Sequence, residues 1–297
     1  MKPSPLRFHR PAELDEALVL LGELGADAKV LAGGQSLVPM LSMRLAAPAH
    51  VVDITGLPGL DAVDAGADEV TFGALVTHTA LLSHEGAARS QPLLRHALRL
   101  VAHPTIRNRG TTLGSIVHAD PSAEMPAVLG LLGGSVLVRS LAGGERRIEA
   151  AELFAGPLES TLDPTEIAVL ASVPAQRPGT GTAVAELARR HGDYAMAGAV
   201  VEVQVSDGAL TRARATFVSA GELGEVVELT AAAGTPAHGD AGRWRPVVDQ
   251  VHELVRTDDD IHASAHYRRH LVGVLVLRAL EEAVLDANHD TTTEGAA

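Results

Sequence analysis

The sequence predicts an α+β fold, in which two small mixed units precede a C-terminal unit made of an antiparallel sheet and helices. Short apolar runs alternate with amphipathic helical patterns over residues 1–176. Residues 199–205 then alternate apolar and polar side chains, and the pattern returns over 210–218 after Asp207-Gly208, which suits a two-residue hairpin turn. Two helical patterns close the chain, over residues 244–254 and 265–286.

The composition excludes several classes of protein. Hydrophobic residues make up 46% of the 297 residues, enough for two or three domains with cores. No apolar run approaches the roughly 20 residues of a membrane-spanning helix. No apolar signal core follows Met1–Pro5, so we expect no export signal. The net charge of −13 argues against a nucleic-acid partner, which needs clustered Lys and Arg.

Cysteine is absent from the chain. Disulfides and cysteine-ligated iron–sulfur clusters are therefore excluded within this chain. The same composition fits a cytoplasmic location, which we expect.

The first unit is predicted over residues 1–54. Its first helix, 11–24, has apolar residues at helical spacing, with Pro11 in the first turn and Gly25 at the exit. A buried strand, a helix and a second strand follow, over residues 29–31, 36–44 and 51–54. The turn-rich segment 55–59 ends this β-α-β unit.

The second unit is predicted over residues 55–176, and the C-terminal unit over 177–287. In the second unit Thr77 suits a helix cap. Its strands are expected near 69–72, 135–139, 146–148 and 167–173, and a helix over 93–101. The Pro- and Gly-rich segment 174–181 marks the boundary. The polar tail 288–297 is predicted to be disordered.

A glycine loop follows the strand at 29–31. The apolar run ends at Gly33-Gly34, and Gln35 and Ser36 precede the next helix. Adjacent glycines permit positive φ and close approach of a ligand, and amide groups at a helix start favour an anion. The pattern fits a phosphate site or a plain turn.

A second loop of small residues spans Gly110–Ser115, with Arg107 and Arg109 just upstream. Two such loops in separate units suggest a diphosphate held between them. The ligand would be a dinucleotide without a Rossmann fingerprint, because no Gly-x-Gly-x-x-Gly is present.

Carboxylates and one tyrosine are further candidates. Asp120-Pro121 is predicted to cap a helix, with Glu124 one turn later. Glu124 could accept hydrogen bonds from ribose or ribityl hydroxyls, or lie on a solvated helix face. Tyr194, beside Asp193, could lie against a flat heteroaromatic ring or belong to the core.

Three histidines, His262, His266 and His270, lie four residues apart on a predicted helix. This spacing allows metal binding, but no carboxylate or cysteine completes a ligand set, so we assign no metal site. No Gly-x-Ser-x-Gly elbow and no P-loop is present, and no catalytic residue is assigned.

Four stretches together resemble one family. They are residues 32–40, 105–127, 189–195 and 260–280, the last with the pattern Asp-x-His-x-Ser-Ala-x-Tyr-Arg-Arg. The chain resembles, over nearly its whole length, the FAD-binding (medium) subunit of the molybdenum hydroxylases. This family includes the medium subunit of carbon monoxide dehydrogenase and the flavin domain of xanthine dehydrogenase.

The resemblance implies a two-subdomain FAD-binding domain of the PCMH (vanillyl-alcohol-oxidase-like) type and a small C-terminal α/β domain. It implies FAD as cofactor, a large molybdopterin subunit and a small 2Fe–2S subunit as partners, and electron flow from the clusters through FAD to a terminal acceptor. The residues implied at the cofactor are Leu31, Ala32, Gly33, Gly34, Gln35, Ser36, Leu37, Ile106, Gly110, Thr111, Thr112, Gly114, Ser115, His118, Asp120, Glu124, Val169, Asp193 and Tyr194.

Three departures from the family pattern keep alternatives open. Leu113 stands where glycine is usual, Glu186 stands where lysine is common, and residues 221–229 lack a Pro-rich, Arg-bearing turn. One alternative is a stand-alone FAD-dependent oxidoreductase acting directly on a small organic substrate. Another is a non-catalytic nucleotide-binding or assembly protein.

Overall fold

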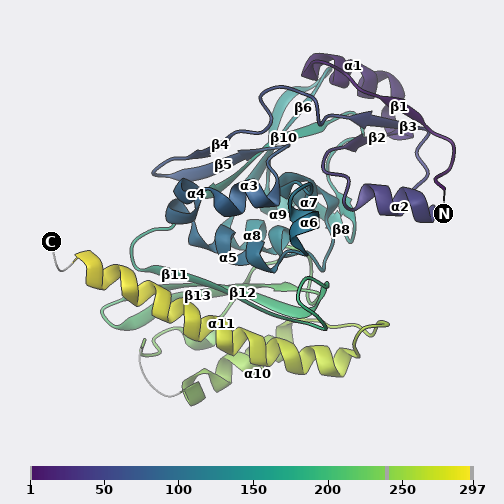
Figure 1. Cartoon of the computed structure of the whole chain (residues 1–297). Coiled ribbons are helices and arrows are strands. Elements are labelled where there is room, and N and C mark those ends of the chain that lie inside the picture. Colours follow the sequence, from purple (N-terminus) through teal and green to yellow (C-terminus); the bar gives the residue numbers. More distant parts are fainter. Residues whose placement is uncertain (1, 238–240, 295–297) are drawn as a thin grey trace.

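The structure is a computed structural model that describes residues 2–237 and 241–294. Figure 1 shows two lobes. The upper lobe holds two sheets and a layer of short helices. The lower lobe holds a third sheet, and its outer face is covered by the long C-terminal helix.

The first sheet is parallel and has the order β1-β3-β2. The predicted strands and helices of this segment are present, but α1 begins at Leu14, so the expected place of Pro11 in its first turn was wrong. The sheet also contains β1, a short exposed strand without apolar alternation that the sequence did not reveal. The elements are β1 Arg7–His9, α1 Leu14–Leu24, η1 Gly25–Asp27, β2 Ala28–Leu31, α2 Leu37–Met43 and β3 His50–Asp53.

The second sheet is antiparallel, with the order β4-β5-β10-β6-β7. Its strands are β4 Val63–Ala65, β5 Glu69–Gly73, β6 Ser135–Ser140, β7 Gly144–Glu149 and β10 Ile167–Pro174, and a separate pair is formed by β8 Phe154–Gly156 and β9 Glu159–Ser160.

Short helices lie between this sheet and the lower sheet (Figure 1). They are α3 His78–Ser83, α4 Glu85–Ser90, α5 Pro92–Leu100, α6 Pro104–Arg107, α7 Thr112–His118, α8 Glu124–Leu132 and α9 Ala150–Leu153. Thr77 caps α3 as predicted, because its hydroxyl accepts a bond from the Ala80 amide.

The third sheet is antiparallel, with the order β11-β12-β13-β14. The predicted hairpin turn is confirmed: Asp207 and Gly208 have φ of 51° and 74°, as a type I′ turn requires. The elements are β11 Thr180–Ala188, β12 Ala195–Ser206, β13 Ala209–Val218, β14 Val227–Glu228, η2 Thr230–Ala232, η3 Ala241–Trp244, α10 Arg245–Leu254 and α11 Ala265–Glu294.

Two hydrophobic cores hold the chain together. One core joins α1, the five-stranded sheet and α8, and it also includes Val200 and Val218 of the third sheet. The other lies between the third sheet and the helices α10 and α11. The sheets change near residues 54 and 176, whereas the first core runs across residue 54, so the division into units stays a prediction.

The C-terminal segment differs from its prediction. The sequence predicted disorder from residue 288, but α11 continues to Glu294. Ala287 is buried and the Asn288 amide donates to the Val284 carbonyl, 2.8 Å away. Extending a helix that is already anchored adds one hydrogen bond per residue without a new nucleus, so polar residues continue it. Residues 295–297 of the predicted tail lie outside the described part.

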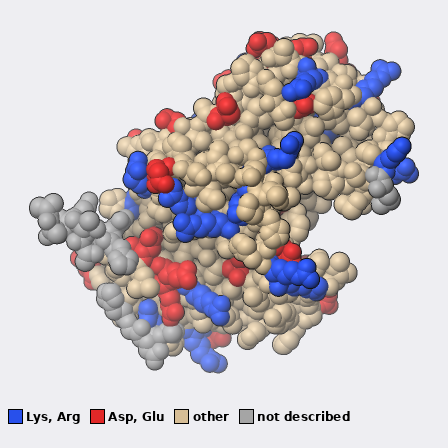
Figure 2. All heavy atoms as spheres, in the orientation of Figure 1, with Lys and Arg blue, Asp and Glu red and all other residues tan. Residues whose placement is uncertain are grey.

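The surface of the face seen in Figure 1 carries acidic and basic side chains interspersed, with large areas that carry neither (Figure 2). Among the described helices, α11 included, none combines the length and the apolar character needed to cross a membrane.

Candidate functional site

The two glycine loops lie against each other. A methyl group on Gly33 would stand 2.8 Å from the Gly110 Cα and 2.8 Å from the Thr111 nitrogen, and it would overlap the Arg109 carbonyl oxygen. Real Cβ atoms do not approach so closely, so only glycine permits this packing at residue 33. The tertiary structure therefore brings together two loops that are more than seventy residues apart in sequence.

The first loop leaves its backbone donors free. Within the described ranges, the backbone amides of residues 33–36 donate no hydrogen bond. Every residue from Leu31 to Leu37 is half-buried rather than covered, and Gly34 has a φ of 72°. Consecutive free amides in an accessible loop suit the oxygens of a phosphate group.

The second loop is held from behind by a buried histidine, His78. Its backbone amide donates to the Gly110 carbonyl at 2.9 Å, and its Nδ1 lies 3.1 Å from the Thr112 hydroxyl. Burial, with a smaller contribution from the Arg107 charge, lowers the pKa of His78 to about 4, so the ring is neutral. The sequence did not identify His78 as a site residue, because a side chain that supports a loop from behind leaves no characteristic spacing in the sequence.

The residues of the second loop have different orientations. Thr112 uses its hydroxyl for His78 and its amide for the Val76 carbonyl, so both groups point inward. The Thr111 hydroxyl accepts a bond from the Gly114 amide, and a methyl group on Gly114 would stand 2.5 Å from that hydroxyl. Gly114 is thus required by the helix cap.

Leu113 does not block the site. Its side chain is 1% exposed and belongs to the hydrophobic core of the upper lobe. The departure from glycine at this residue is therefore accommodated away from the loop surface. Arg107 is also engaged, because it donates to the carbonyls of Val101 and Ala102, whereas Arg109 lies exposed beside the loop.

Helix α7 runs from this loop toward a carboxylate cluster. It has seven residues, a length of about 10 Å. The predicted cap at Asp120-Pro121 was wrong: α8 begins at Glu124 with Ala123 as its cap residue. Asp120 instead accepts a bond from the Ser122 amide at 2.9 Å, because a local turn follows the left-handed Ala119 (φ 56°).

Glu124 is buried, not on a solvated face. It is 7% exposed, and burial, with the nearby charges of Glu186 and Asp120, raises its pKa to about 8. Burial likewise raises the pKa of Glu186, on β11, to about 7. One oxygen of Glu186 is buried and has no hydrogen-bond partner among the described residues.

Tyr194 extends over the same cluster. Its side chain is 64% exposed, so it is not a core tyrosine. Partial burial of the hydroxyl, together with the charge of Asp120 and a hydrogen bond to it, raises the pKa of Tyr194 to about 12. The turn before it packs on the upper lobe, because a methyl group on Gly192 would stand 2.6 Å from the His103 ring. Asp193 is exposed on this turn.

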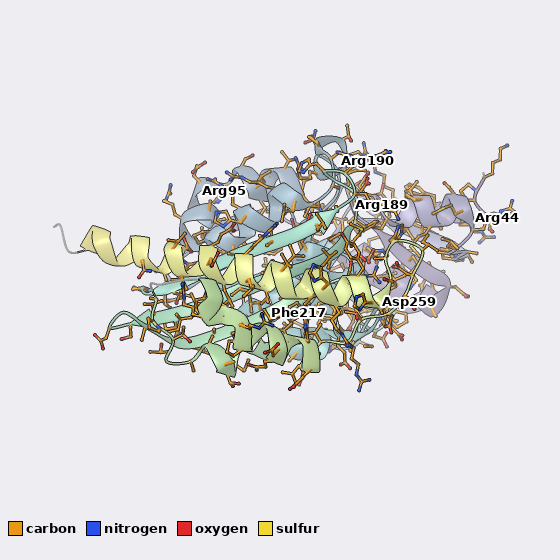
Figure 3. All side chains as sticks on the ribbon, turned by 90° about the horizontal axis from the view of Figure 1, so that it is seen from below. Arg44, Arg95, Arg189, Arg190, Phe217 and Asp259 are labelled. Carbon is orange, nitrogen blue, oxygen red and sulfur yellow. The ribbon has the colours of Figure 1, made fainter. Side chains whose placement is uncertain are left out.

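Arg189 and Arg190 precede this turn, and Figure 3 shows them on the side of the molecule where the N-terminal unit carries Arg44. Both are exposed, and Arg189 donates to the His262 carbonyl at 3.1 Å.

The remaining predicted residues frame these loops. Ile106, in α6, provides the carbonyl that accepts the Gly110 amide. Ser115 and His118 are half-buried on α7. Val169 is buried at the register shift of β10, where its carbonyl accepts the Ala74 amide.

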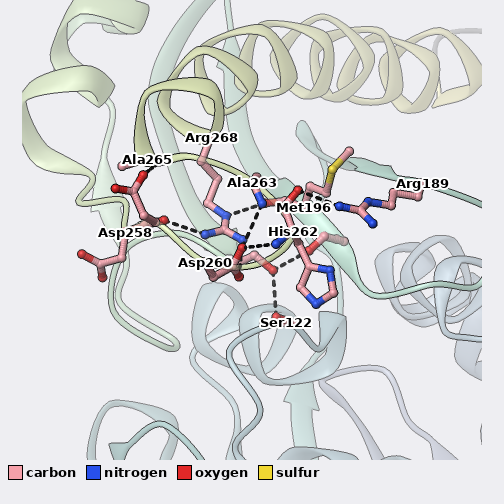
Figure 4. A network of polar contacts seen from close by, with 12 residues as sticks. Ser122, Arg189, Met196, Asp258, Asp260, His262, Ala263, Ala265 and Arg268 are labelled. Carbon is pink, nitrogen blue, oxygen red and sulfur yellow. Dashed lines mark hydrogen bonds and ion pairs between the residues drawn. The ribbon is translucent and has the colours of Figure 1, made fainter.

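The Asp-x-His pattern before α11 has a structural role. Arg268 is 6% exposed and donates to the Met196 carbonyl, the Asp258 carbonyl and the Asp260 carboxylate, at 2.8, 2.7 and 2.7 Å (Figure 4). The other Asp260 oxygen accepts the amides of His262 and Ala263. This network fixes the loop before α11 against the start of β12, next to Tyr194.

The structure does not bring His262, His266 and His270 onto one helix face. Helix α11 begins at Ala265, so His262 precedes it and does not share a helix face with His266 and His270. In the described part of the chain, no group of three or more His, Cys, Asp or Glu side chains has metal-binding geometry.

The residues present fit the expected FAD. Four amides without hydrogen-bond partners among the described residues lie in a loop that packs against a second small-residue loop, which suits a diphosphate. About one helix length away, buried carboxyl groups and an exposed aromatic ring offer partners for hydroxyls and for a flat ring.

Most of the chain matches two family models and several known proteins. Residues 4–176 match the family model described as FAD binding domain in molybdopterin dehydrogenase. Residues 182–283 match the model of the CO dehydrogenase flavoprotein C-terminal domain. The nicotine 6-hydroxylase medium subunit of Paenarthrobacter nicotinovorans is 36% identical, covering 95% of this chain and 99% of that protein. The carbon monoxide dehydrogenase medium chain of Hydrogenophaga pseudoflava is 33% identical, over 95% and 98%.

Solved structures show the same fold. A chain of carbon monoxide dehydrogenase from Hydrogenophaga pseudoflava superimposes with a TM-score of 0.89 at 32% identity, covering 96% of this chain and 99% of that one. A chain of quinoline 2-oxidoreductase from Pseudomonas putida 86 gives a TM-score of 0.89 at 30% identity, over 97% and 99%.

Proposed function

Since the chain belongs to the family of FAD-binding subunits of molybdopterin dehydrogenases, we propose that it is the medium, FAD-binding subunit of a heteromeric molybdenum hydroxylase. It receives electrons from iron–sulfur clusters in a partner subunit and passes them through FAD to a terminal acceptor. The observation that carries this proposal is the contact between the Gly33 loop and the Gly110 loop, with four free amides at their junction.

The bound FAD supplies the redox chemistry, taking up and releasing electrons. This chain's residues bind and orient it. The amides of residues 33–36 hold the diphosphate, and the loop at 110–111 packs against Gly33 and supports that loop. His78 fixes the second loop in place and, being neutral, adds no charge to it.

At the other end of the site, Glu124 and Tyr194 meet the ribityl chain and the ring system. The Arg268 network supports the backbone just after Tyr194, which sets the position of that ring. Val169, buried on β10, is the candidate contact of the ring system from that strand. The division into two FAD-binding subdomains, 1–54 and 55–176, and a C-terminal domain from 177 follows the three sheets and is part of this proposal.

The partners are a large molybdopterin subunit and a small 2Fe–2S subunit. The names of the relatives support this, because they describe medium chains or subunits of complexes. Those relatives act on different molecules, among them nicotine, caffeine and carbon monoxide. The substrate is therefore a property of the complex, and we assign none to this chain.

The test is purification of the tagged chain from its native host, with flavin, molybdenum and iron analysis. We expect one FAD per chain and two further subunits, one of them rich in cysteine. Recovery of the flavin-containing chain alone, with its FAD reduced directly by a small organic compound, would instead establish the stand-alone oxidoreductase. A cytoplasmic location stays a prediction, which fractionation of the same cells checks.

A further inference from the structure

Ser219 lies where the two lobes meet, directly after β13. Its backbone amide donates to the Pro121 carbonyl of the upper lobe, 2.8 Å away. Its hydroxyl donates to the Ala195 carbonyl at 2.6 Å, and the Ser122 hydroxyl lies 2.9 Å from it. Since a serine hydroxyl has one proton and a carbonyl has none, Ser122 donates to Ser219 in this arrangement. One side chain therefore ties a turn of the upper lobe to the start of β12.

Each end of this tie adjoins a candidate site residue. Ser122 belongs to the turn of Asp120, whose carboxylate accepts the Ser122 amide at 2.9 Å. Ala195 is buried and follows Tyr194 directly in the chain. The tie thus runs from the Asp120 side of the site, in the upper lobe, to the Tyr194 side, in the lower lobe.

The strand that follows Tyr194 begins irregularly. Strands β11 and β12 pair with a register shift at residues 195–197, as in a β-bulge. The Ala195 carbonyl at this shift accepts the Ser219 hydroxyl. The next carbonyl, that of Met196, accepts Arg268 (Figure 4). Two side chains from different elements therefore hold the backbone just after Tyr194.

Ser219 itself has a left-handed backbone, with a φ of 57°. Glycine adopts this conformation freely, whereas a residue with a side chain is strained in it. The backbone alone therefore favours glycine, and the feature that serine adds is its hydroxyl. Strained residues of this kind persist where the surrounding contacts fix them, and they cluster at functional sites.

We propose that Ser219 is a positioning residue of the cofactor site, which fixes the backbone that carries Tyr194 relative to the turn of Asp120. This inference rests on the proposed function, because that function makes Tyr194 a contact of the flavin ring. Ser219 acts through Ala195 and does not itself bind the cofactor. Without the Ser219 hydroxyl, the Ala195 carbonyl loses a donor, and the ring of Tyr194 shifts from the position that the flavin requires.

The first measurement is fluorine NMR of the whole chain labelled with fluorotyrosine, without FAD. The chain has two tyrosines, so two signals are expected, and Tyr267→Phe assigns them. In Ser219→Ala and Ser219→Gly we expect the Tyr194 signal to move toward that of the urea-unfolded chain, by the same amount in both. Ser206→Ala removes an exposed serine hydroxyl at the far end of β12, so this control should leave the signal in place.

The two Ser219 variants separate positioning from stability. Glycine relieves the strained φ and alanine does not, so urea unfolding should rank Ser219→Gly above Ser219→Ala. Both variants lack the hydroxyl, so the Tyr194 signal should be alike in the two proteins. A Tyr194 signal that follows the stability ranking, or that stays at the wild-type position in both variants, would overturn the proposal.

The second measurement is FAD binding to the same proteins, with the visible circular dichroism of the bound flavin. We expect Ser219→Gly to bind FAD about tenfold more weakly, as for the loss of one hydrogen bond, and to alter the flavin spectrum. Ser206→Ala should match the wild type. Wild-type affinity and spectrum in Ser219→Gly would contradict the positioning role. If the wild-type chain binds no FAD, the proposed function fails, while the NMR measurement still decides whether Ser219 fixes Tyr194.

Discussion

Gly33 packs directly on Gly110, with room for no side chain between the two loops: a Cβ on Gly33 would stand 2.8 Å from the Gly110 Cα. This contact joins the parallel sheet of residues 7–53 to the helices of the second unit. It converts two weak glycine patterns into one binding surface.

The first prediction concerns this contact. In Gly33→Ala the new methyl group overlaps the backbone of residues 109–111, which cannot move without disturbing the His78 and Thr111 bonds. We expect loss of most bound FAD, measured as the flavin-to-protein absorbance ratio. Gly22→Ala is the control, because its methyl group meets only a Leu141 carbon at 3.8 Å. A Gly33→Ala protein with full flavin content would show that the diphosphate lies elsewhere.

The second prediction uses the left-handed backbone of Gly34. Its φ of 72° strains any L side chain, and a Cβ would also meet Leu31 and Val38 at 3.1 and 3.2 Å. Gly34→Val should abolish FAD retention while circular dichroism still shows a folded chain. Strain of this kind is on the order of 1–3 kcal/mol, below the stability of a typical domain. Retention of flavin in the folded variant would place the diphosphate away from this loop.

The third prediction is a loss of stability in acid. The folded-state pKa of His78, about 4, is below its ordinary value of 6.5, so the unfolded chain binds the proton more readily. The contribution of neutral His78 to the free energy of unfolding is complete above pH 6.5. It is lost as the pH falls through 4, by on the order of 3 kcal/mol. His78→Gln should flatten this part of the denaturant-unfolding profile, and the exposed His96→Gln should not. Parallel profiles for wild type and His78→Gln would refute the buried neutral ring.

The fourth prediction is the opposite pH dependence for Glu186. Its folded-state pKa is raised to about 7. The contribution of the protonated carboxyl group to the free energy of unfolding is therefore present below pH 4.5 and is lost as the pH rises through 7. Glu186→Gln should therefore be more stable than the wild type at pH 8, by on the order of 1–3 kcal/mol, with no gain at pH 4. Urea unfolding at the two pH values measures this, and an equal change at both would contradict it.

The fifth prediction concerns the buried guanidinium of Arg268. Lysine cannot reach three acceptors in one plane, so Arg268→Lys leaves two carbonyl groups or the Asp260 carboxylate unpaired. We expect a loss on the order of 2–4 kcal/mol in thermal unfolding. Arg269→Lys, exposed on the same helix, is the control. Equal melting temperatures for the two variants would remove Arg268 from the structural role assigned here.

Several elements could be predicted from local patterns alone. The hairpin at Asp207-Gly208, the Thr77 cap and the helix ending at Leu24 follow from turn chemistry, side-chain capping and apolar spacing, which act over a few residues. The predicted helix cap at Asp120 was wrong because this carboxylate accepts the Ser122 amide in a local turn instead. The predicted disorder was wrong for residues 288–294 because these polar residues extend a helix whose earlier part is packed.

The candidate site also combines features that the sequence shows with features that only the packing decides. The sequence identified the two loops, Glu124 and Tyr194 as candidates, and its likeness to a family identified FAD as the cofactor, because glycine content and motif spacing are local properties. Four features depend on the packing of distant segments: the contact of Gly33 with Gly110, the burial of Leu113, the support by His78 and the burial of Glu124. Burial and the charges of remote neighbours set the protonation of these groups, and no run of adjacent residues encodes them.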